Sequence, residues 1–178
     1  MIAEEVAEYI SDTKSPQGLF AAAVRRDGGL SAQSRRVVVL DGIQDPGNVG
    51  TIIRTAEAFG FDGAVMIGAC ADAFSPKALR ASMGSALRLP IESCSAGELS
   101  GLLRGFAIFG AMLDSSAVRL GEAVFPERCA VVIGSEGAGI SPEVISVCTG
   151  KLYIPIRNAE SLNAAVAAAV IMWEMRKQ

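Results

Sequence analysis

From residue 36 onward, short apolar runs rich in β-branched residues alternate with longer segments of helical periodicity. Strands are expected at 37–40, 64–67, 87–91, 106–112, 130–133 and 151–156, and helices at 48–60, 75–83, 96–104, just after 141–142 and from about 161. Such alternation is typical of an α/β fold, a mostly parallel sheet flanked by helices. A chain of 178 residues is long enough to bury one core of this kind.

The first 35 residues differ from the rest of the chain. They contain an amphipathic helix, a strand-like segment at Gly18–Val24 and a polar linker with glycines over residues 27–35. One helix and one strand cannot form a core, so this part packs on the main domain, packs on a partner or is the remnant of a lost domain. We therefore divide the chain into an N-terminal extension and linker, residues 1–35, and a main domain, residues 36–178.

The last predicted helix has almost no polar face. Its apolar run, Ala164–Trp173, is ten residues long, well short of the roughly 20 that cross a bilayer. A helix that is apolar nearly all round must be covered on more than one side, either within one subunit or by a second copy of the chain. The first 12 residues are acidic and lack a basic start, which is unlike a signal peptide. We therefore expect a cytoplasmic protein with no membrane contact.

The residue types present narrow the chemistry that the chain can perform. There is no histidine, which excludes the Ser-His-Asp triad, the usual zinc sites and the commonest general base. The four cysteines lie far apart without a C-x-x-C pair, so we expect them to pack as thiols. The net charge of −3 lacks the overall basic footprint of a nucleic-acid binder. Any contact with nucleic acid therefore requires a local patch.

Three polar loops follow the strands predicted at 37–40, 130–133 and 151–156. Parallel α/β sheets bind ligands at the carboxyl ends of their strands, so these loops form the candidate functional site. In the first loop, Asn48 is placed at a helix start and Arg54 in the second turn. Taken alone, Asn48 is expected to be a helix cap and Arg54 a solvated charge.

The second loop, residues 134–139, is rich in glycine and could cradle a phosphate near a helix start. It lacks the Walker lysine and the dinucleotide fingerprint, and Glu136 suits a cationic or hydroxyl-bearing ligand better than a phosphate. In the third loop, residues 154–163, Ser161 is a candidate helix cap. Asn163 is an amide at the start of a buried helix and needs hydrogen-bond partners, which a bound ligand could provide.

Three stretches of the chain resemble the motifs of the SpoU (TrmH) family of RNA 2′-O-ribose methyltransferases. They occur in family order at residues 40–60 (LDGIQDPGNVGTIIRTAEAFG), 131–141 (VVIGSEGAGIS) and 152–169 (LYIPIRNAESLNAAVAAA). Residues 77–90 (KALRASMGSALRLP) also resemble the family sequence between the first two motifs. The resemblance covers residues 36–176 and is specific, because three separate motifs would have to coincide.

The resemblance implies a SPOUT fold with a C-terminal deep trefoil knot, a homodimer, and S-adenosylmethionine as the cofactor. Residues 36–178 are then the catalytic domain, and the substrate is structured RNA, either ribosomal or transfer RNA. The cofactor product is S-adenosylhomocysteine, and the reaction requires no metal. Several cofactor contacts are expected through backbone groups around the adenine. The residues carried over as cofactor-binding are Leu113, Gly134, Ser135, Gly137, Ile154, Ile156 and Leu162.

The resemblance also assigns five catalytic residues. Arg54 comes from the partner subunit, and Asn48 positions both Arg54 and the RNA backbone. The family's proposals make Arg54 the base, but a guanidinium holds its proton too tightly. We expect Arg54 to orient a phosphate or to stabilise the developing alkoxide. Glu136, Ser161 and Asn163 fix the loops and the substrate ribose.

The chain departs from many family members near its N-terminus. Residues 15–20 resemble only the closing segment of a ribosomal-protein-like RNA-binding domain, which leaves the RNA target open. Local arginines are candidates for phosphate contacts, namely Arg25, Arg26, Arg35, Arg36, Arg80 and Arg88. Two other functions stay open: a non-catalytic SPOUT module that binds cofactor or RNA, and a nucleotide-phosphate-binding α/β protein.

Overall fold

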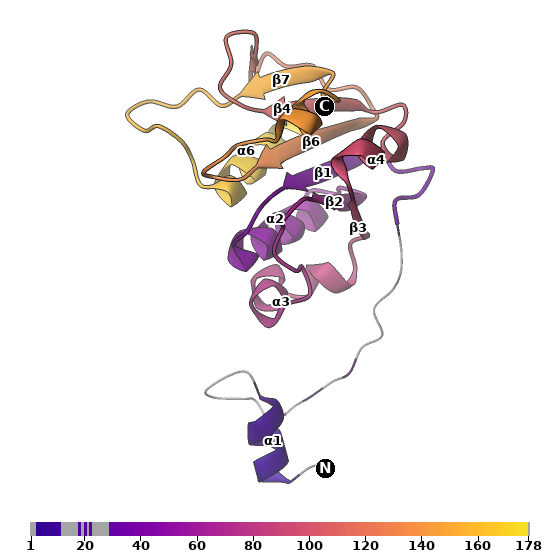
Figure 1. Ribbon diagram of the computed structural model, residues 1–178, viewed down its shortest axis with the longest axis vertical. Helices are drawn as coiled ribbons and strands as arrows, with labels where there is room; N and C mark the ends of the chain where they lie inside the picture. Colours follow the sequence, from indigo (N-terminus) through magenta and orange to yellow (C-terminus); the bar gives the residue numbers. More distant parts are fainter. Residues whose placement is uncertain (1–2, 12–17, 19, 21, 23–28, 178) are drawn as a thin grey trace.

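The computed structural model describes residues 3–11, 18, 20, 22 and 29–177 (Figure 1). Within these residues, a seven-stranded sheet has the order β3-β2-β1-β6-β4-β7-β5, and all its pairings are parallel. The strands are β1 (Arg36–Asp41), β2 (Gly63–Ile67), β3 (Ile91–Cys94), β4 (Ala107–Ala111), β5 (Val118–Arg119), β6 (Cys129–Gly134) and β7 (Gly150–Tyr153). The predicted α/β fold with a parallel sheet is confirmed.

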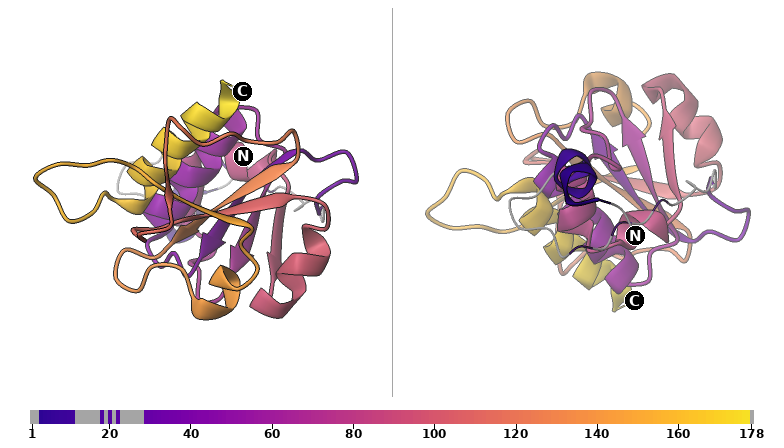
Figure 2. Two further views of the ribbon diagram at one scale, coloured as in Figure 1. Left: turned by 90° about the horizontal axis from the view of Figure 1, so that it is seen from above. Right: turned by 90° about the horizontal axis from the view of Figure 1, so that it is seen from below.

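Helices cover both faces of the sheet. Helices α2 (Pro46–Ala58) and α6 (Ala164–Arg176) share a core with Val38 and Leu40, and Figure 2 shows the two helices side by side. Helices α4 (Ala96–Leu102) and α5 (Pro142–Ile145) share the opposite core with Val37 and Val39. Successive residues of a strand point to opposite faces, so the uninterrupted apolar run of β1 is buried on both sides. The remaining helical segments are α1 (Glu4–Ile10), α3 (Pro76–Ser82) and the 3-10 turn η1 (Ser85–Leu87).

The strand predicted at 87–91 is largely a turn, and β3 begins only at its last residue. The backbone N–H groups of residues 87–89 bond back to the carbonyls of residues 84 and 85 instead of joining the sheet. Arg88 also binds the Glu57 carboxylate of α2 through Nε and Nη2, at 2.7 and 2.8 Å. The prediction of a strand here was wrong because a partner 31 positions away in sequence holds the turn.

Two further differences concern strand ends. The last strand was predicted to run to residue 156, but β7 ends at Tyr153. Pro155 has no backbone N–H with which to continue the ladder. The two-residue strand β5 was not predicted, because Val118 and Arg119 are too short a segment to show any periodicity.

Both helices at the candidate site begin with a different cap from the predicted one. Asp45 rather than Asn48 caps α2, because its carboxylate accepts the N–H of Gly47 at 2.9 Å. Asn163 rather than Ser161 caps α6, where its Oδ1 accepts two backbone N–H groups at 3.0 and 3.2 Å. The side chain of Asn48 is therefore available for contacts with other loops.

Helix α6 buries only part of its apolar surface. Ile171 and Met172 are fully or almost fully buried, and the ring of Trp173 lies 5.5 Å from that of Phe59 in α2. On the outer side, Val166, Val170 and Trp173 remain 50%, 39% and 45% exposed. Their spacing of four and three residues places them in one stripe along the helix. Among the helices of the described residues, none has the length and apolar character to cross a membrane.

Helix α1 matches the helix predicted near the N-terminus, and Figure 1 shows it apart from the sheet. Its apolar side chains Val6, Tyr9 and Ile10 are exposed. The strand-like segment predicted at 18–24 lies mostly outside the described residues. The domain boundary at residue 35 and the trefoil knot stay predictions.

Candidate active site

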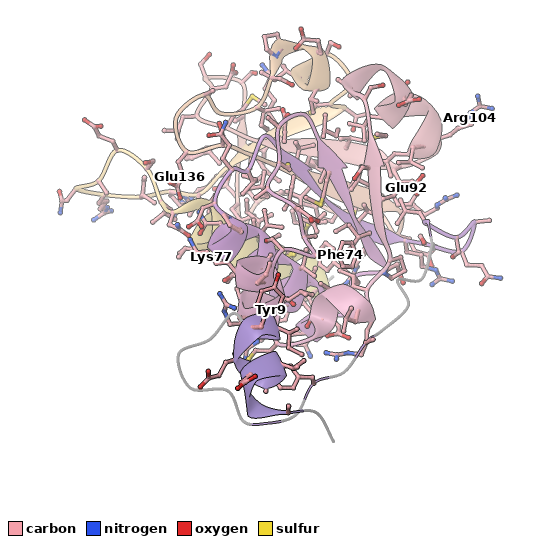
Figure 3. The ribbon with its side chains drawn as sticks, turned by 60° about the horizontal axis from the view of Figure 1, so that its bottom comes forward. Tyr9, Phe74, Lys77, Glu92, Arg104 and Glu136 are labelled. Carbon is pink, nitrogen blue, oxygen red and sulfur yellow. The ribbon has the colours of Figure 1, made fainter. Side chains whose placement is uncertain are left out.

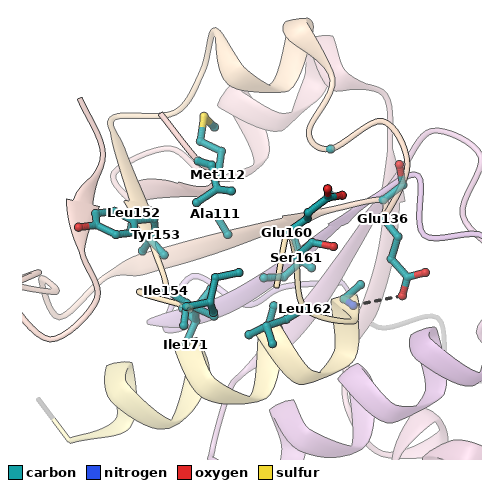
Figure 4. Close-up of a pocket in the computed structure, with 18 residues that line it drawn as sticks. Ala111, Met112, Glu136, Leu152, Tyr153, Ile154, Glu160, Ser161, Leu162 and Ile171 are labelled. Atoms are coloured by element: carbon teal, nitrogen blue, oxygen red, sulfur yellow. Dashed lines mark hydrogen bonds between the residues drawn. The ribbon is translucent and has the colours of Figure 1, made fainter. Parts of the chain in front are cut away.

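A pocket of about 220 Å³ opens at the carboxyl edge of the sheet (Figure 4). Its walls come from three segments that are distant in sequence: residues 111–113 at the end of β4, residues 133–139 at the end of β6, and residues 152–162 at the end of β7. Because β4 pairs with both β6 and β7 in parallel, these three strand ends meet at one place. Residues of α6 complete the pocket.

Most of the residues predicted for the site line this pocket. Those predicted to bind a cofactor that line it are Leu113, Gly134, Ser135, Ile154, Ile156 and Leu162. Gly137 is exposed on the second loop and does not line the pocket. Glu136 and Ser161, predicted as catalytic, also line it, whereas Asn48, Arg54 and Asn163 lie outside the lining.

Several residues of the pocket wall, most of them apolar, were not predicted from the sequence. They are Ala111, Met112, Ile133, Gly139, Leu152, Tyr153, Glu160, Ala164, Ala167 and Ile171. The sequence contained a pattern that could have identified the last three, because positions 164, 167 and 171 recur at helical spacing and so share one face of α6. The strand-end residues carry no such signal, since only the pairing of β4 with β7 brings them together.

The loop after β6 closes tightly on itself. The N–H of Ser135 donates to the carbonyl of Gly139 at 3.1 Å, and the N–H of Gly139 donates back at 2.9 Å. A Cβ at Gly134 would lie 2.2 Å from the Gly139 carbonyl carbon, so this position accepts only glycine without a shift of the backbone. Gly139 itself has a φ of 70°, which favours glycine. The glycines thus hold Glu136 at the tip of a fixed loop.

Glu136 joins the three polar loops through a closed set of hydrogen bonds. Its Oε1 accepts from Asn48 Nδ2 at 3.0 Å and from Asn163 Nδ2 at 2.8 Å. Asn163 Nδ2 also donates to Asn48 Oδ1 at 3.0 Å. Figure 4 shows Glu136 reaching the start of α6, where the same Oε1 accepts the N–H of Ala164 at 3.3 Å. The structure brings these three predicted residues into one hydrogen-bonded triangle.

The geometry of this triangle fixes which atom each side chain presents. The Oδ1 of Asn163 is occupied by two N–H groups of α6, so its amide nitrogen must face Glu136. An amide nitrogen only donates and an ionised carboxylate only accepts. Glu136 is therefore the acceptor that both amides require, and a second acceptor at position 163 would break the arrangement.

The segment between β7 and α6 keeps its backbone polar groups free. Within the described part of the chain, none of the N–H and C=O groups of residues 155–162 makes a backbone hydrogen bond. Buried or ligand-facing backbone groups need partners. The pocket is lined by residues 156 and 160–162 of this segment, so a ligand there can bind to the main chain.

Arg54 lies apart from the triangle. Six residues of α-helix turn the chain by about 600°, so Arg54 points roughly 120° away from Asn48 around α2. Its side chain is exposed and has no hydrogen-bond or ion-pair partner among the described residues. The amide of Asn48 contacts Glu136 and Asn163 and makes no hydrogen bond to Arg54 within the described chain. The positioning of Arg54 by Asn48, with Arg54 coming from the partner subunit, stays a prediction.

Two exposed carboxylates hold loops that flank the site. The hydroxyl and backbone N–H of Ser116, followed by the ammonium of Lys151, lower the pKa of Asp114 from 3.8 to about 2. A hydrogen bond from Lys77, followed by one from a backbone N–H, lowers the pKa of Asp45. Both carboxylates are ionised at neutral pH and keep these contacts, which fixes the residues after β4 and the start of α2.

Fold and pocket together define an α/β domain with a pocket at the carboxyl edge of a parallel sheet, where such sheets bind ligands, beside a carboxylate held by two amides. The chain belongs to the SpoU rRNA methylase family, whose model matches residues 35–173. The resemblance seen in the three polar loops is thereby confirmed, and the chain is an RNA methyltransferase.

Known proteins similar to the chain agree with this membership. It is 35% identical over 179 residues to the 23S rRNA (guanosine(2553)-2′-O)-methyltransferase RlmP of Bacillus subtilis, with 99% of this chain and 71% of the relative covered. A TrmH-family structure from Porphyromonas gingivalis matches with a TM-score of 0.83 and 38% identity, covering 96% of this chain and 70% of that one. An AdoMet-bound rRNA methyltransferase from Sinorhizobium meliloti matches with a TM-score of 0.79 and 30% identity, covering 85% of this chain and 61% of that one.

Proposed function

We propose that the chain transfers the methyl group of S-adenosylmethionine to a ribose 2′-hydroxyl of ribosomal or transfer RNA, as a homodimer, and releases S-adenosylhomocysteine. The observation that carries the proposal is the pocket between the ends of β4, β6 and β7, with the triangle of Asn48, Glu136 and Asn163 at its side. The name of the Bacillus subtilis relative favours ribosomal RNA and the 2′-oxygen.

The pocket suits the cofactor chemically. Its mostly apolar walls fit an adenine ring, and the free backbone groups of residues 156 and 160–162 can bind the polar edge of that ring. Glu136 and Glu160 are the carboxylates of the lining, and their negative charge favours a cationic ligand such as a sulfonium. When bound, S-adenosylmethionine supplies an activated methyl group, and the transfer requires no metal.

The residues around the pocket supply alignment and charge. A ribose hydroxyl gains negative charge as its proton leaves, so the site must orient the oxygen and stabilise that charge. Arg54 carries a permanent positive charge and stabilises the developing alkoxide or holds the adjacent phosphate. The triangle keeps the second and third loops together, and Ser161 contributes its hydroxyl at the pocket wall.

A second copy of the chain completes the site. Arg54 points away from the triangle of its own subunit, and its exposed guanidinium can enter the pocket of a partner. The exposed apolar stripe of α6, formed by Val166, Val170 and Trp173, gives the partner a surface to cover. This homodimer explains why a helix that is apolar nearly all round leaves three large side chains in solvent.

Residues 36–178 form the catalytic domain in this proposal, and residues 1–35 form an N-terminal extension and linker. The match of the family model to residues 35–173 supports this boundary. Ribosomal and transfer RNA are cytoplasmic substrates, so we place the enzyme in the cytoplasm.

The test is methyl transfer from radiolabelled S-adenosylmethionine to ribosomal or transfer RNA taken from cells that lack the gene. We expect Arg54→Ala to lower turnover at least about 100-fold, the typical effect of removing one group that stabilises transition-state charge. Its affinity for S-adenosylhomocysteine should stay unchanged. Arg104→Ala is the matched control, because Figure 3 shows Arg104 pointing into solvent away from Glu136.

The other outcomes separate the alternatives. A parent protein that binds the cofactor but methylates no RNA tried would contradict the enzymatic proposal and favour a non-catalytic module. Greater thermal stabilisation by a nucleoside triphosphate with magnesium than by S-adenosylmethionine would favour a nucleotide-phosphate-binding protein instead.

A further inference from the structure

A second cavity, of about 430 Å³, opens on the same edge of the sheet as the cofactor pocket. It lies at the carboxyl ends of β2 and β3, between the segment 68–74 and the start of α4. In the sheet order, β1 separates these two strands from β6, β4 and β7, which border the cofactor pocket. Figure 3 shows Phe74 and Glu136 on two separate segments, one at each cavity. The position is one where parallel α/β sheets bind ligands.

The lining of this cavity combines apolar walls with oxygen acceptors. Met66, Phe74 and Ile91 contribute apolar surface, and Asp72 and Glu98 contribute carboxylates. Among the described residues that line it, none is Lys or Arg. A phosphate would meet two negative charges there without a balancing cation. A flat apolar ring that carries N–H donors matches both parts of the lining.

The two carboxylates are held in place by local hydrogen bonds. Asp72 Oδ1 accepts the N–H of Phe74 at 2.9 Å. Glu98 Oε2 accepts the N–H and the hydroxyl of Ser95 at 2.8 and 2.7 Å, and these bonds lower the pKa of Glu98. Within the described part of the chain, the other oxygen of each carboxylate accepts no hydrogen bond. Each residue therefore presents a fixed acceptor with an unused oxygen.

We propose that this cavity binds a guanine base of the substrate RNA while the target ribose occupies the cofactor pocket; the inference rests on the proposed function. Guanine presents a ring N–H and an exocyclic amine side by side, so one carboxylate can accept from two adjacent donors at once. Adenine and cytosine each place a ring acceptor beside the amine, and uracil flanks its N–H with two acceptors. Protein sites commonly read RNA bases that leave the stack through apolar contacts and this edge.

The first test replaces the two carboxylates without disturbing their local structure. In Asp72→Asn and Glu98→Gln the remaining carbonyl oxygen can still accept from Phe74 or Ser95, but the free oxygen becomes a donor. We expect the double variant to raise the KM for 23S rRNA about tenfold or more, the usual effect of losing a specific base contact. The kcat and the affinity for S-adenosylhomocysteine should not change.

The matched control is Glu122→Gln with Glu127→Gln, which removes the same charge from exposed carboxylates that line neither cavity. Only the double variant at Asp72 and Glu98 should raise the KM. An unchanged KM in that variant, or an equal rise in the control, would overturn the proposal.

The second test uses two native thiols of the cavity, Cys70 and Cys94, and does not depend on catalysis. Bound 23S rRNA should slow their alkylation by iodoacetamide at pH 8.5, as followed by mass spectrometry. Cys148 lines neither cavity and should react at the same rate with and without RNA. Methyl transfer without protection of Cys70 and Cys94 would refute this inference alone, whereas protection without methyl transfer would refute only the proposed function.

Discussion

Asn163→Asp isolates the hydrogen-bonded triangle from the helix cap that the same residue provides. Asp caps a helix as well as Asn does, so the two N–H groups of α6 keep their acceptor. The amide nitrogen that donates to Glu136 at 2.8 Å and to Asn48 at 3.0 Å is replaced by an oxygen. Two carboxylates then face each other where a donor and an acceptor stood.

The size of the effect follows from these contacts. A hydrogen bond to a charged group contributes about 1.5–3 kcal/mol, and two facing charges repel by about 1–4 kcal/mol near a protein surface. Glu136 and Asn163 are both exposed, so solvent screens the pair and lets the loops separate. We therefore expect the free energy of unfolding to fall by only about 1–2 kcal/mol. Turnover should fall about 100-fold, because a shift of about 1 Å in a catalytic site has that consequence.

The assay compares three variants by urea unfolding and by methyl transfer. Asn163→Ala loses the cap as well as the triangle and should also be inactive, with about 1 kcal/mol lost through the missing cap. Asn158→Asp makes the same chemical change in the same loop, at an exposed residue outside the triangle, and should leave turnover close to that of the parent. Parental turnover in Asn163→Asp would refute the role assigned to the triangle.

Three further predictions test the pocket, the core and the dimer. Gly134→Ala should destabilise the fold by about 1–3 kcal/mol and abolish binding of S-adenosylhomocysteine in calorimetry, because the added Cβ meets backbone at 2.2 Å. Gly137→Ala, with open space around its Cβ, should do neither. Burial raises the pKa of Cys129 and Cys148 from 9.0 to about 11, so the unfolded chain loses these protons first and the free energy of unfolding should fall between pH 9 and 11. In urea titrations over this pH range, the free energy of unfolding of the variant with Cys129→Ala and Cys148→Ala should fall less steeply than that of the parent. The same pH dependence in both proteins would contradict the assignment to these thiols. Val170→Lys should sediment as a monomer in analytical ultracentrifugation and should show no methyl transfer in the activity assay. A fully active monomer would refute the contribution of Arg54 from the partner subunit.

The sequence predicted the fold wherever local pattern and tertiary structure agree. The apolar run of β1 and the alternation after it were sufficient for a parallel α/β sheet. They were not sufficient for the residues before β3, where the long-range pair of Arg88 and Glu57 holds a turn. The cap of α2 was predicted wrongly for a related reason. Asp45 and Asn48 are both residue types that cap helices well, and only the packing of the loops shows that Asn48 contacts Glu136 instead.

The candidate site could be predicted in its residues but not in its contacts. The resemblance to the family selected residues that line one pocket, such as Gly134, Ile154 and Leu162. The positioning of Arg54 by Asn48 stays a prediction, whereas the contacts of Asn48 with Glu136 and Asn163 could not be predicted, because they depend on how the three loops pack. Met112 and Tyr153 could not be predicted as pocket residues from the sequence, because only the pairing of β4 with β7 brings them to the pocket.

The central claim, that this chain methylates a ribose 2′-oxygen in RNA, is tested most directly by mapping 2′-O-methylation across all ribosomal and transfer RNA. The cells compared carry the intact gene, no gene, or the gene with Arg54→Ala. We expect one nucleotide whose 2′-O-methyl group is present with the intact gene and missing in both other strains. Identical methylation maps in the three strains, or a lost methyl group that returns with Arg54→Ala, would contradict it.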